Sequence, residues 1–433
     1  MKKLLSCVGT GTLYDTIYRL GEHEYRTRVV QKALCQHYLP DEVILFVTEE
    51  AKAKNLPDVT DALGSQKVTI IDIPVGKSEA EIWQIFSLVT GAVHPDDEIV
   101  FDITHGFRSL PFIALLSIAY LREICPFTLA GVVYGAFDAP EKNPADSEHT
   151  ITRAPVFDLS GFVTIFDWMA GVRSFLHHAD ARLLKEQVER ISDEEFSKTK
   201  TRSGTRPLKK LLGPLSTYAE AVRLSRPIEA MNKAREIHEK LPKVTGAIEN
   251  YTPVLTPLLS KISEIERFAV SQDATILTQE ALEKQRALIG DQVEKGLYQQ
   301  AVTLAREWMV TVFLYAAGSE DLWLSDNVRK HAEHALNDAK QRIISERNNQ
   351  DRTGRGPQEE DGRLIEWFYS QNCWDEVAKI WAGIPELRNQ LAHCGMSENP
   401  RTVKSLENSI KNLITSLDTY YSLLISSSGN DAP

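Results

Sequence analysis

Apolar and polar positions in the first 160 residues follow two alternating repeats. Short runs rich in Val and Ile, bounded by Gly, Pro or acidic residues, are typical of buried strands. Between these runs, apolar residues recur at helical spacing, as in Arg26 to Tyr38 and in Glu79 to Val93. Alternation of this kind predicts a parallel-rich sheet with helices on both faces, so residues 1–160 are expected to form a Rossmann-like α/β domain. The predicted strands are Lys3 to Val8, Val43 to Thr48, Lys67 to Pro74, Glu98 to Ile103 and Phe127 to Ala136.

After Asp158 the pattern becomes helical and rich in Ala, Leu, Glu, Lys and Arg. We expect one long helix over Phe162 to Gln187 and a soft boundary near residue 270. These expectations give an all-α connector over residues 161–270 and a second all-α domain over residues 271–433. Arg347 to Gly362 contains almost no apolar residue and is predicted to be a loop. Further helical segments are expected at Thr217 to Leu224, Pro227 to Leu241 and Tyr251 to Phe268.

Composition narrows the class of protein. Apolar residues at 42% and charged residues at 25% are typical of soluble globular proteins. The formal charge of −11 argues against nucleic-acid binding by bulk electrostatics, so any such site must be local. Five dispersed cysteines without a CxxC pair indicate a reducing, cytoplasmic location and no cysteine zinc site. The longest apolar stretch, Leu110 to Leu121, is shorter than the roughly 20 residues of a membrane span, so no membrane anchor is predicted.

Two predicted strands of the α/β domain end in polar turns. The strand at Glu98 to Ile103 leads into a turn and then a helix, and the first strand leads into a glycine-containing turn. The carboxyl ends of parallel strands form the edge where ligands bind, and helix amino termini there offer free N–H groups to phosphates. We therefore predict a site for a phosphorylated ligand. Its candidate residues are Gly9, Thr10 and Gly11 in the first turn and Thr104, His105, Gly106 and Arg108 in the second.

These turns also allow plainer interpretations. Asp, Thr, Gly and Ser are common turn formers, and His105 could simply cap a helix. A nicotinamide-dependent enzyme is a further alternative on such a scaffold. It is weakened because Tyr14 stands where a dinucleotide fingerprint has its third glycine.

A second candidate site lies near the carboxyl end, in the segment Ile384 to Gly395. Pro385 suits a first helical turn, Glu386 the positive helix end, and Gly395 a left-handed stop, which predicts a helix beginning near Pro385. Leu387, Leu391 and Cys394 are expected to form its buried stripe. Three polar residues, Arg388, Asn389 and His393, then share a compact exposed face.

This trio suits RNA cleavage without a metal. A ribose 2′-hydroxyl must lose a proton, the 5′-leaving oxygen must gain one, and arginine can stabilise charge on phosphate. One helix offers only one copy of each group, so the chemistry predicts a dimeric site. The alternative is an ordinary helix with an exposed Arg388 and with His393 near its negative end.

The two segments together resemble a known family. Asp102-Ile-Thr104-His105-Gly106 is similar to the DxTHG motif of CARF (CRISPR-associated Rossmann-fold) domains, and Arg388-Asn389-Gln-Leu-Ala-His393 is similar to the RNxxxH motif of HEPN ribonucleases. Their order resembles that of CARF–HEPN effector ribonucleases of type III CRISPR systems. Gly296 to Trp308 is also similar to the opening helix of HEPN domains in that family.

The resemblance implies a function. A CARF dimer over residues 1–160 would bind cyclic oligoadenylate, most often cyclic tetra-adenylate, and activate single-stranded RNA cleavage by a HEPN dimer over residues 271–433. Arg388 and His393 would inherit the catalytic roles, with Asn389 supporting them, and the two polar turns would inherit ligand contact. A homodimer or a higher assembly of dimers is implied, with no cofactor and no metal. The alternative is a nucleotide sensor whose helical half recruits a partner and is not catalytic.

Three smaller features stay open. His177, His178 and Asp180 resemble a metal cluster, but adjacent helical histidines diverge by about 100°, which favours an interface or solvated face. Glu307 is a candidate partner for Arg388, or merely solvates its helix. A basic run could guide RNA or be a plain exposed loop. This run consists of Lys198, Lys200, Arg202, Arg206, Lys209 and Lys210.

Overall fold

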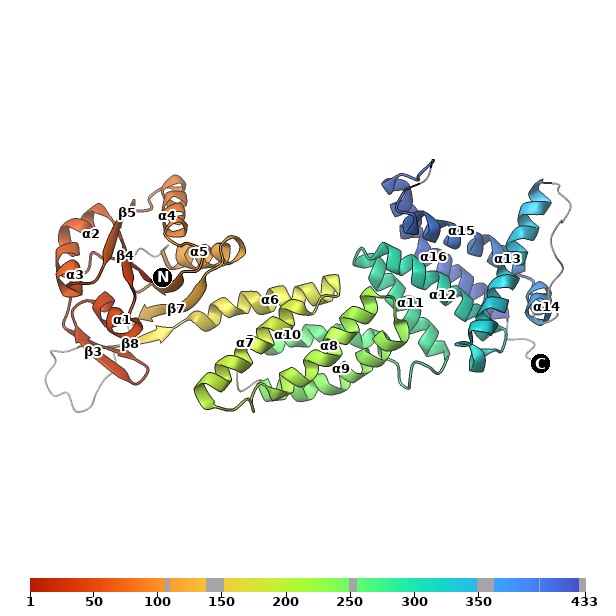
Figure 1. Ribbon diagram of the computed structural model, residues 1–433, viewed down its shortest axis with the longest axis horizontal. Coiled ribbons are helices and arrows are strands. Elements are labelled where there is room, and N and C mark those ends of the chain that lie inside the picture. Colours follow the sequence, from red (N-terminus) through yellow and green to blue (C-terminus); the bar gives the residue numbers. More distant parts are fainter. Residues whose placement is uncertain (106–109, 138–151, 249–254, 349–361, 397, 428–433) are drawn as a thin grey trace. The chain divides into compact units, whose positions relative to one another are not determined.

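The chain forms two compact units, Met1–Asp167 and Trp168–Pro433 (Figure 1). The computed structural model describes residues 1–105, 110–137, 152–248, 255–348, 362–396 and 398–427. The predicted loop at Arg347 to Gly362 lies almost wholly outside the described residues.

The first unit is built on one mixed eight-stranded sheet. Its order is β3-β2-β8-β7-β6-β1-β4-β5, and the five strands from β5 to β7 are parallel to one another. The parallel-rich Rossmann-like sheet is therefore confirmed, with all five predicted strands present. The strands are β1 (Lys2–Cys7), β2 (Thr16–Leu20), β3 (His23–Thr27), β4 (Glu42–Val47), β5 (Val68–Asp72), β6 (Glu98–Asp102), β7 (Thr128–Gly135) and β8 (Thr152–Asp158).

The sequence pattern does not predict three of the strands, β2, β3 and β8. β2 and β3 form an antiparallel hairpin at one edge, and β8 joins it to β7 by pairing parallel with β2 and antiparallel with β7. Polar side chains in the hairpin and Pro155 within β8 obscure the alternation that would mark them as strands.

Helices cover both faces of the sheet, because side chains alternate sides along each strand. Leu4 packs into a core with α1 and α3, while Leu5 packs into a separate core with α4 and α5. The helices of this unit are α1 (Val30–Tyr38), α2 (Glu49–Lys54), α3 (Leu56–Leu63), α4 (Glu79–Gly91) and α5 (Leu110–Ile124).

The strand order reverses direction at β1. From β1 the chain moves to β4 and β5 on one side, and then returns to β6 and β7 on the other. A crevice forms at such a switch point beyond the carboxyl ends of the two central strands. Here the central strands are β1 and β6, paired in parallel with Ser6 opposite Asp102.

The second unit is helical, and no strand follows Asp158 in the described part of the chain. One apolar core extends from Trp168 to Leu424, on both sides of residue 270, so the boundary expected there stays a prediction. The helices are α6 (Ser160–His178), which begins in the first unit, α7 (Arg182–Thr199), α8 (Arg206–Arg223), α9 (Pro227–Ile248), α10 (Leu255–Ile262), α11 (Gln279–Glu294), α12 (Tyr298–Ala316), α13 (Asp326–Asn348), α14 (Gly362–Ser370), α15 (Trp374–Ala392) and α16 (Val403–Ser427), with 3₁₀ turns η1 (Ser263–Phe268) and η2 (Glu320–Leu322).

The single long helix expected over Phe162 to Gln187 is wrong. The chain breaks after His178, where Ala179 adopts a left-handed φ of 50°, and a new helix begins at Arg182. Ala179 is buried, so apolar periodicity continues through the break and conceals it.

Candidate functional site

A pocket of about 250 Å³ opens at the carboxyl ends of β1 and β6. It brings together five of the seven predicted ligand residues. The other two, Gly106 and Arg108, lie outside the described residues. The lining is Cys7, Val8, Gly9, Thr10, Gly11, Phe46, Thr48, Ile73, Thr104 and His105.

Gly9 lies directly against His105. A Cβ atom added to Gly9 would stand 3.2 Å from the His105 Cβ and 3.3 Å from its Cγ, which is tighter than normal packing. Gly9 is not among the residues with positive φ, so its backbone does not require glycine for conformation. Glycine is needed at this position because the turn after β1 and the turn after β6 approach each other closely.

Asp102 stabilises the turn that follows β6. Its side chain is buried, accepts a 2.6 Å hydrogen bond from the Ser6 hydroxyl and accepts another, 2.9 Å long, from the Thr104 backbone N–H. The Ser6 hydroxyl in turn accepts a hydrogen bond from the Gln31 side chain. The Asp102 carboxylate therefore stabilises this turn and fixes the positions of Thr104 and His105 at its start.

His105 is a largely desolvated imidazole. Burial lowers its pKa below the ordinary histidine value, and the nearby Asp102 carboxylate opposes this effect. The ring stacks on Phe137 with centroids 5.7 Å apart. The lowered pKa favours the uncharged imidazole, which would contact a ligand through a hydrogen bond or stacking.

Sequence reasoning missed the part of this pocket that comes from β4 and β5. Phe46, Thr48 and Ile73 line it, and Thr48 caps α2 by accepting from the Ala51 backbone N–H. The signal was present, because Thr48 ends a predicted strand at the same edge of the sheet.

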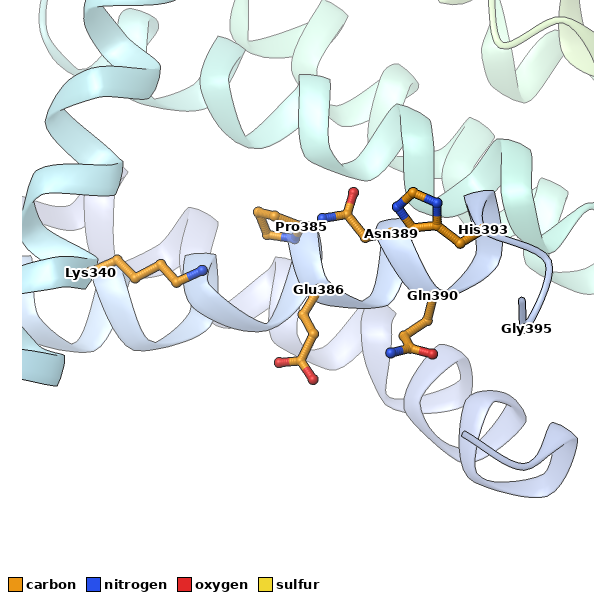
Figure 2. Close-up of a pocket in the computed structure, with 7 residues that line it drawn as sticks. All are labelled: Lys340, Pro385, Glu386, Asn389, Gln390, His393 and Gly395. Carbon is orange, nitrogen blue, oxygen red and sulfur yellow. The ribbon is translucent and has the colours of Figure 1, made fainter. Parts of the chain in front are cut away.

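A second pocket, of about 280 Å³, lies on α15 (Figure 2). Asn389 and His393 leave one side of this helix, and Glu386 and Gln390 leave the other. Lys340 of α13 lines the same pocket and was not among the predicted residues. The remaining lining residues are Pro385 and Gly395.

The predicted trio is only partly assembled around this pocket. Arg388 is exposed and does not line it, but its guanidinium donates a 3.2 Å hydrogen bond to the Asn389 side-chain oxygen. Within one chain, the pocket therefore combines the His393 imidazole and two amides with the Lys340 ammonium and the Glu386 carboxylate.

The expected helix start at Pro385 is wrong. α15 begins at Trp374, and Pro385 lies in its interior together with Glu386, which is therefore remote from the helix amino terminus. Buried Val377, Trp381 and Ile384 carry the helical periodicity through the proline. Burial of these side chains offsets the backbone hydrogen bond that a proline cannot donate.

The left-handed stop expected at Gly395 is confirmed, whereas the expected buried stripe needs a correction. The helix stops at Ala392, and both Cys394 and Gly395 have positive φ, of 54° and 72°. Leu387 is buried as expected and Leu391 is half-buried, but Cys394 is exposed because the chain has already left the helix.

Glu307 does not pair with Arg388. Its carboxylate accepts from the Arg306 and Arg329 guanidinium groups, and Arg306 also bonds Glu333 of α13. The Arg306 guanidinium lies 5.8 Å from the centre of the Trp381 ring in α15. This network joins α12, α13 and α15.

Among the remaining candidates, Asp180 and Arg202 have local partners. Asp180 accepts from the Arg182 guanidinium and backbone, which lowers the pKa of that carboxyl to about 2. In the described residues no group of His, Cys, Asp and Glu could hold a metal ion. The basic run spans the end of α7, a short connection and the start of α8, where Arg202 pairs with Asp193.

Comparisons with known proteins bear on the first unit. Residues 3–138 match the family model described as the CARF domain of the CRISPR system endoribonuclease Csx1. The amino-terminal unit contains a CARF domain. The pocket at its sheet edge therefore lies in a CARF domain, and it is lined by residues of the turn that resembles the CARF motif and of the neighbouring turn after β1.

A curated relative covers the same region. CRISPR-associated protein MJ1674 of Methanocaldococcus jannaschii is 31% identical over 137 residues, which make up 31% of this chain and 20% of that protein. This chain thus matches about a fifth of the relative's length. The two findings support a CARF-containing, CRISPR-associated protein. Among the described helices, none has both the length and the apolar composition needed to cross a membrane.

Proposed function

We propose that this protein is a CRISPR-associated endoribonuclease that cleaves single-stranded RNA without a metal and is activated by cyclic oligoadenylate. The CARF domain would bind the activator, most often cyclic tetra-adenylate, and the helical unit would carry the ribonuclease site in a HEPN-type domain. The observation that carries the proposal is the CARF pocket at the switch point, lined by Gly9, Thr10, Gly11, Thr104 and His105. The Csx1 description of the matching family names an endoribonuclease.

The chemistry of α15 supports the catalytic part. His393 would accept the proton of a ribose 2′-hydroxyl, whose oxygen then bonds to phosphorus as the bond to the 5′-oxygen breaks. A second imidazole would donate a proton to that leaving oxygen, giving a 2′,3′-cyclic phosphate and a 5′-hydroxyl. Arg388 would stabilise charge on the phosphate, and its bond to Asn389 orients both side chains. Because one chain supplies one His393, the reaction requires a dimer.

An apolar stripe on α5 supports association of two CARF domains. Phe112, Leu116, Tyr120 and Ile124 recur every four residues and lie on one face, with exposed fractions of 62%, 44%, 47% and 59%. An exposed apolar face made of four large side chains is typical of an interaction surface. The helix follows the Thr104–His105 turn in sequence, so a second copy on this face would lie near the proposed ligand site.

The test is cleavage of a labelled single-stranded RNA in EDTA, with and without cyclic oligoadenylates of several ring sizes. We expect one ring size to stimulate cleavage strongly, and His393→Ala to abolish it. His238→Ala is the matched control, because His238 pairs with Glu266 and lines neither pocket. Absence of cleavage with every ring size, or full activity in His393→Ala, would refute the catalytic part.

A second candidate is a cyclic-nucleotide sensor whose helical unit recruits a partner without catalysis. One observation favours it: Arg388 does not line the pocket that holds His393. Tight activator binding by the wild-type protein together with no RNA cleavage would select this function.

A further inference from the structure

The turn after β1 has all three of its backbone carbonyls occupied by two neighbouring side chains. The Asn55 amide donates hydrogen bonds of 2.7 Å to the carbonyl oxygens of both Gly9 and Gly11. The Lys54 ammonium donates a 2.6 Å hydrogen bond to the Thr10 carbonyl between them. Three consecutive carbonyls are thus directed toward the junction of α2 and α3.

Peptide geometry then fixes where the N–H groups point. In a trans peptide the N–H of one residue is opposite to the carbonyl of the residue before it. The N–H groups of Thr10, Gly11 and Thr12 must therefore face away from Lys54 and Asn55. In the part of the chain that the structure describes, these three N–H groups have no hydrogen-bond partner.

Two of the three residues that carry these N–H groups, Thr10 and Gly11, line the pocket, and Thr12 does not. Gly9 also lines it, whereas Lys54 and Asn55 do not. Successive backbone N–H groups that point to one side form a binding site for anions. The nearby imidazole of His105 carries no negative charge that would oppose an anion.

Asn55 is well placed to hold this arrangement. Its side chain is buried, and its backbone both ends α2, by donating to the Ala51 carbonyl, and begins α3. A residue fixed at both helix ends loses little further freedom when its amide binds the turn. Lys54 is exposed and adds a positive charge beside the same turn.

We propose that Asn55, assisted by Lys54, is a positioning residue for a phosphate-binding subsite formed by the N–H groups of Thr10 and Gly11. This inference rests on the proposed function, since it assigns these groups to a phosphodiester of the cyclic oligoadenylate. Asn55 does not contact the ligand. It acts by keeping carbonyl oxygens, which would repel the phosphate, out of the pocket.

The first experiment measures binding of cyclic tetra-adenylate, and of other ring sizes, by calorimetry. Asn55→Ala removes two hydrogen bonds and should weaken binding about tenfold or more. The matched control is Gln66→Ala, because the Gln66 amide also donates to a backbone carbonyl, that of Pro40, away from the pocket. Lys54→Gln should weaken binding several-fold. Its control Lys52→Gln, on the same helix, removes only an exposed pair with Asp72 and should bind normally.

A second readout separates positioning from general stability. Hydrogen exchange in peptides covering residues 8–13 should slow when ligand is added to the wild-type protein and to Gln66→Ala, but not to Asn55→Ala. Normal affinity in Asn55→Ala, or equal losses in Asn55→Ala and Gln66→Ala, would overturn the inference. If the wild-type protein binds no cyclic oligoadenylate, the proposed function fails. Protection of the same peptides by inorganic phosphate, lost in Asn55→Ala, then decides the subsite alone.

Discussion

The hydroxyl oxygen of Thr104 accepts a 2.8 Å hydrogen bond from the backbone N–H of Gly135. This bond joins the turn after β6 to the end of β7. The two residues are also in tight contact, because a Cβ atom on Gly135 would lie 3.0 Å from the Thr104 methyl carbon. A threonine hydroxyl that accepts this bond still has its own proton to donate. Thr104 can therefore hold the sheet edge together and offer a donor to the pocket.

Replacement of Thr104 by Val should be destabilising, whereas replacement by Ser should be nearly neutral. Valine leaves the buried Gly135 N–H without its acceptor, at a cost of about 1–3 kcal/mol, while serine keeps the oxygen. Urea unfolding of the two variants measures the difference, and calorimetry with cyclic tetra-adenylate shows whether the donor is used. Equal stability of Thr104→Val and Thr104→Ser would contradict this account.

Gly9 and Gly11 should respond differently to alanine. A Cβ on Gly9 would press on His105, whereas a Cβ on Gly11 meets no atom within 4 Å. Gly9→Ala should therefore displace His105 and weaken activator binding about tenfold, which corresponds to about 1.4 kcal/mol. Gly11→Ala should bind within about twofold of wild type, since no steric conflict has to be relieved. Similar affinities of the two variants would show that the contact with His105 does not shape the site.

Stability of the CARF domain should decrease as the pH falls below the ordinary histidine value of 6.5. Burial lowers the pKa of His105 in the folded state, so the unfolded chain binds the proton first and is favoured in acid. The pKa of His37 is also lowered, by burial and by nearby His23 and Lys2, and adds an effect of the same sign. Urea midpoints at pH 8 and pH 6 should differ less in His105→Gln than in the wild-type protein. A difference as large as that of wild type would exclude His105 as a source.

Lys340 should contribute to RNA binding in the second pocket. In the described residues Lys340 has no ion-pair partner, and its ammonium is the cation that lines the pocket with His393. Lys340→Gln should raise KM for RNA several-fold and reduce the salt dependence of KM, with a smaller effect on kcat. The control is Lys379→Gln, because Lys379 lies on α15 but pairs with Asp375. A matching change in both variants would point to general electrostatics instead.

The sequence pattern predicts the strands of the parallel sheet well, because each is a short apolar run, including the largely exposed edge strand β5. It fails where polar residues interrupt the apolar run. The β2–β3 hairpin is partly exposed and mixes His23, Glu24 and Arg26 with its apolar residues. β8 contains Pro155, whose carbonyl still accepts from Ala136 although its nitrogen cannot donate.

The candidate sites show the same division. Thr104 and His105 could be predicted because they directly follow a recognisable strand, and ligands bind at the carboxyl ends of parallel strands. Asn55 could not, since its partners Gly9 and Gly11 are distant in sequence and no local pattern links them. Lys340 could not be predicted for the same reason, because α13 and α15 come into contact only in the folded helical unit.

The place of β2 in the sheet has a consequence for how the protein is made. β2 pairs with β8, and Arg153 of β8 bonds Glu24 of the hairpin across 129 residues of sequence. The hairpin leaves the ribosome early, but its neighbour in the sheet emerges only after the rest of the unit has been synthesised. Contacts at such large separation form slowly, because a long loop must close first. We therefore expect the pairing of β2 with β8 to be the last part of this sheet to form during translation.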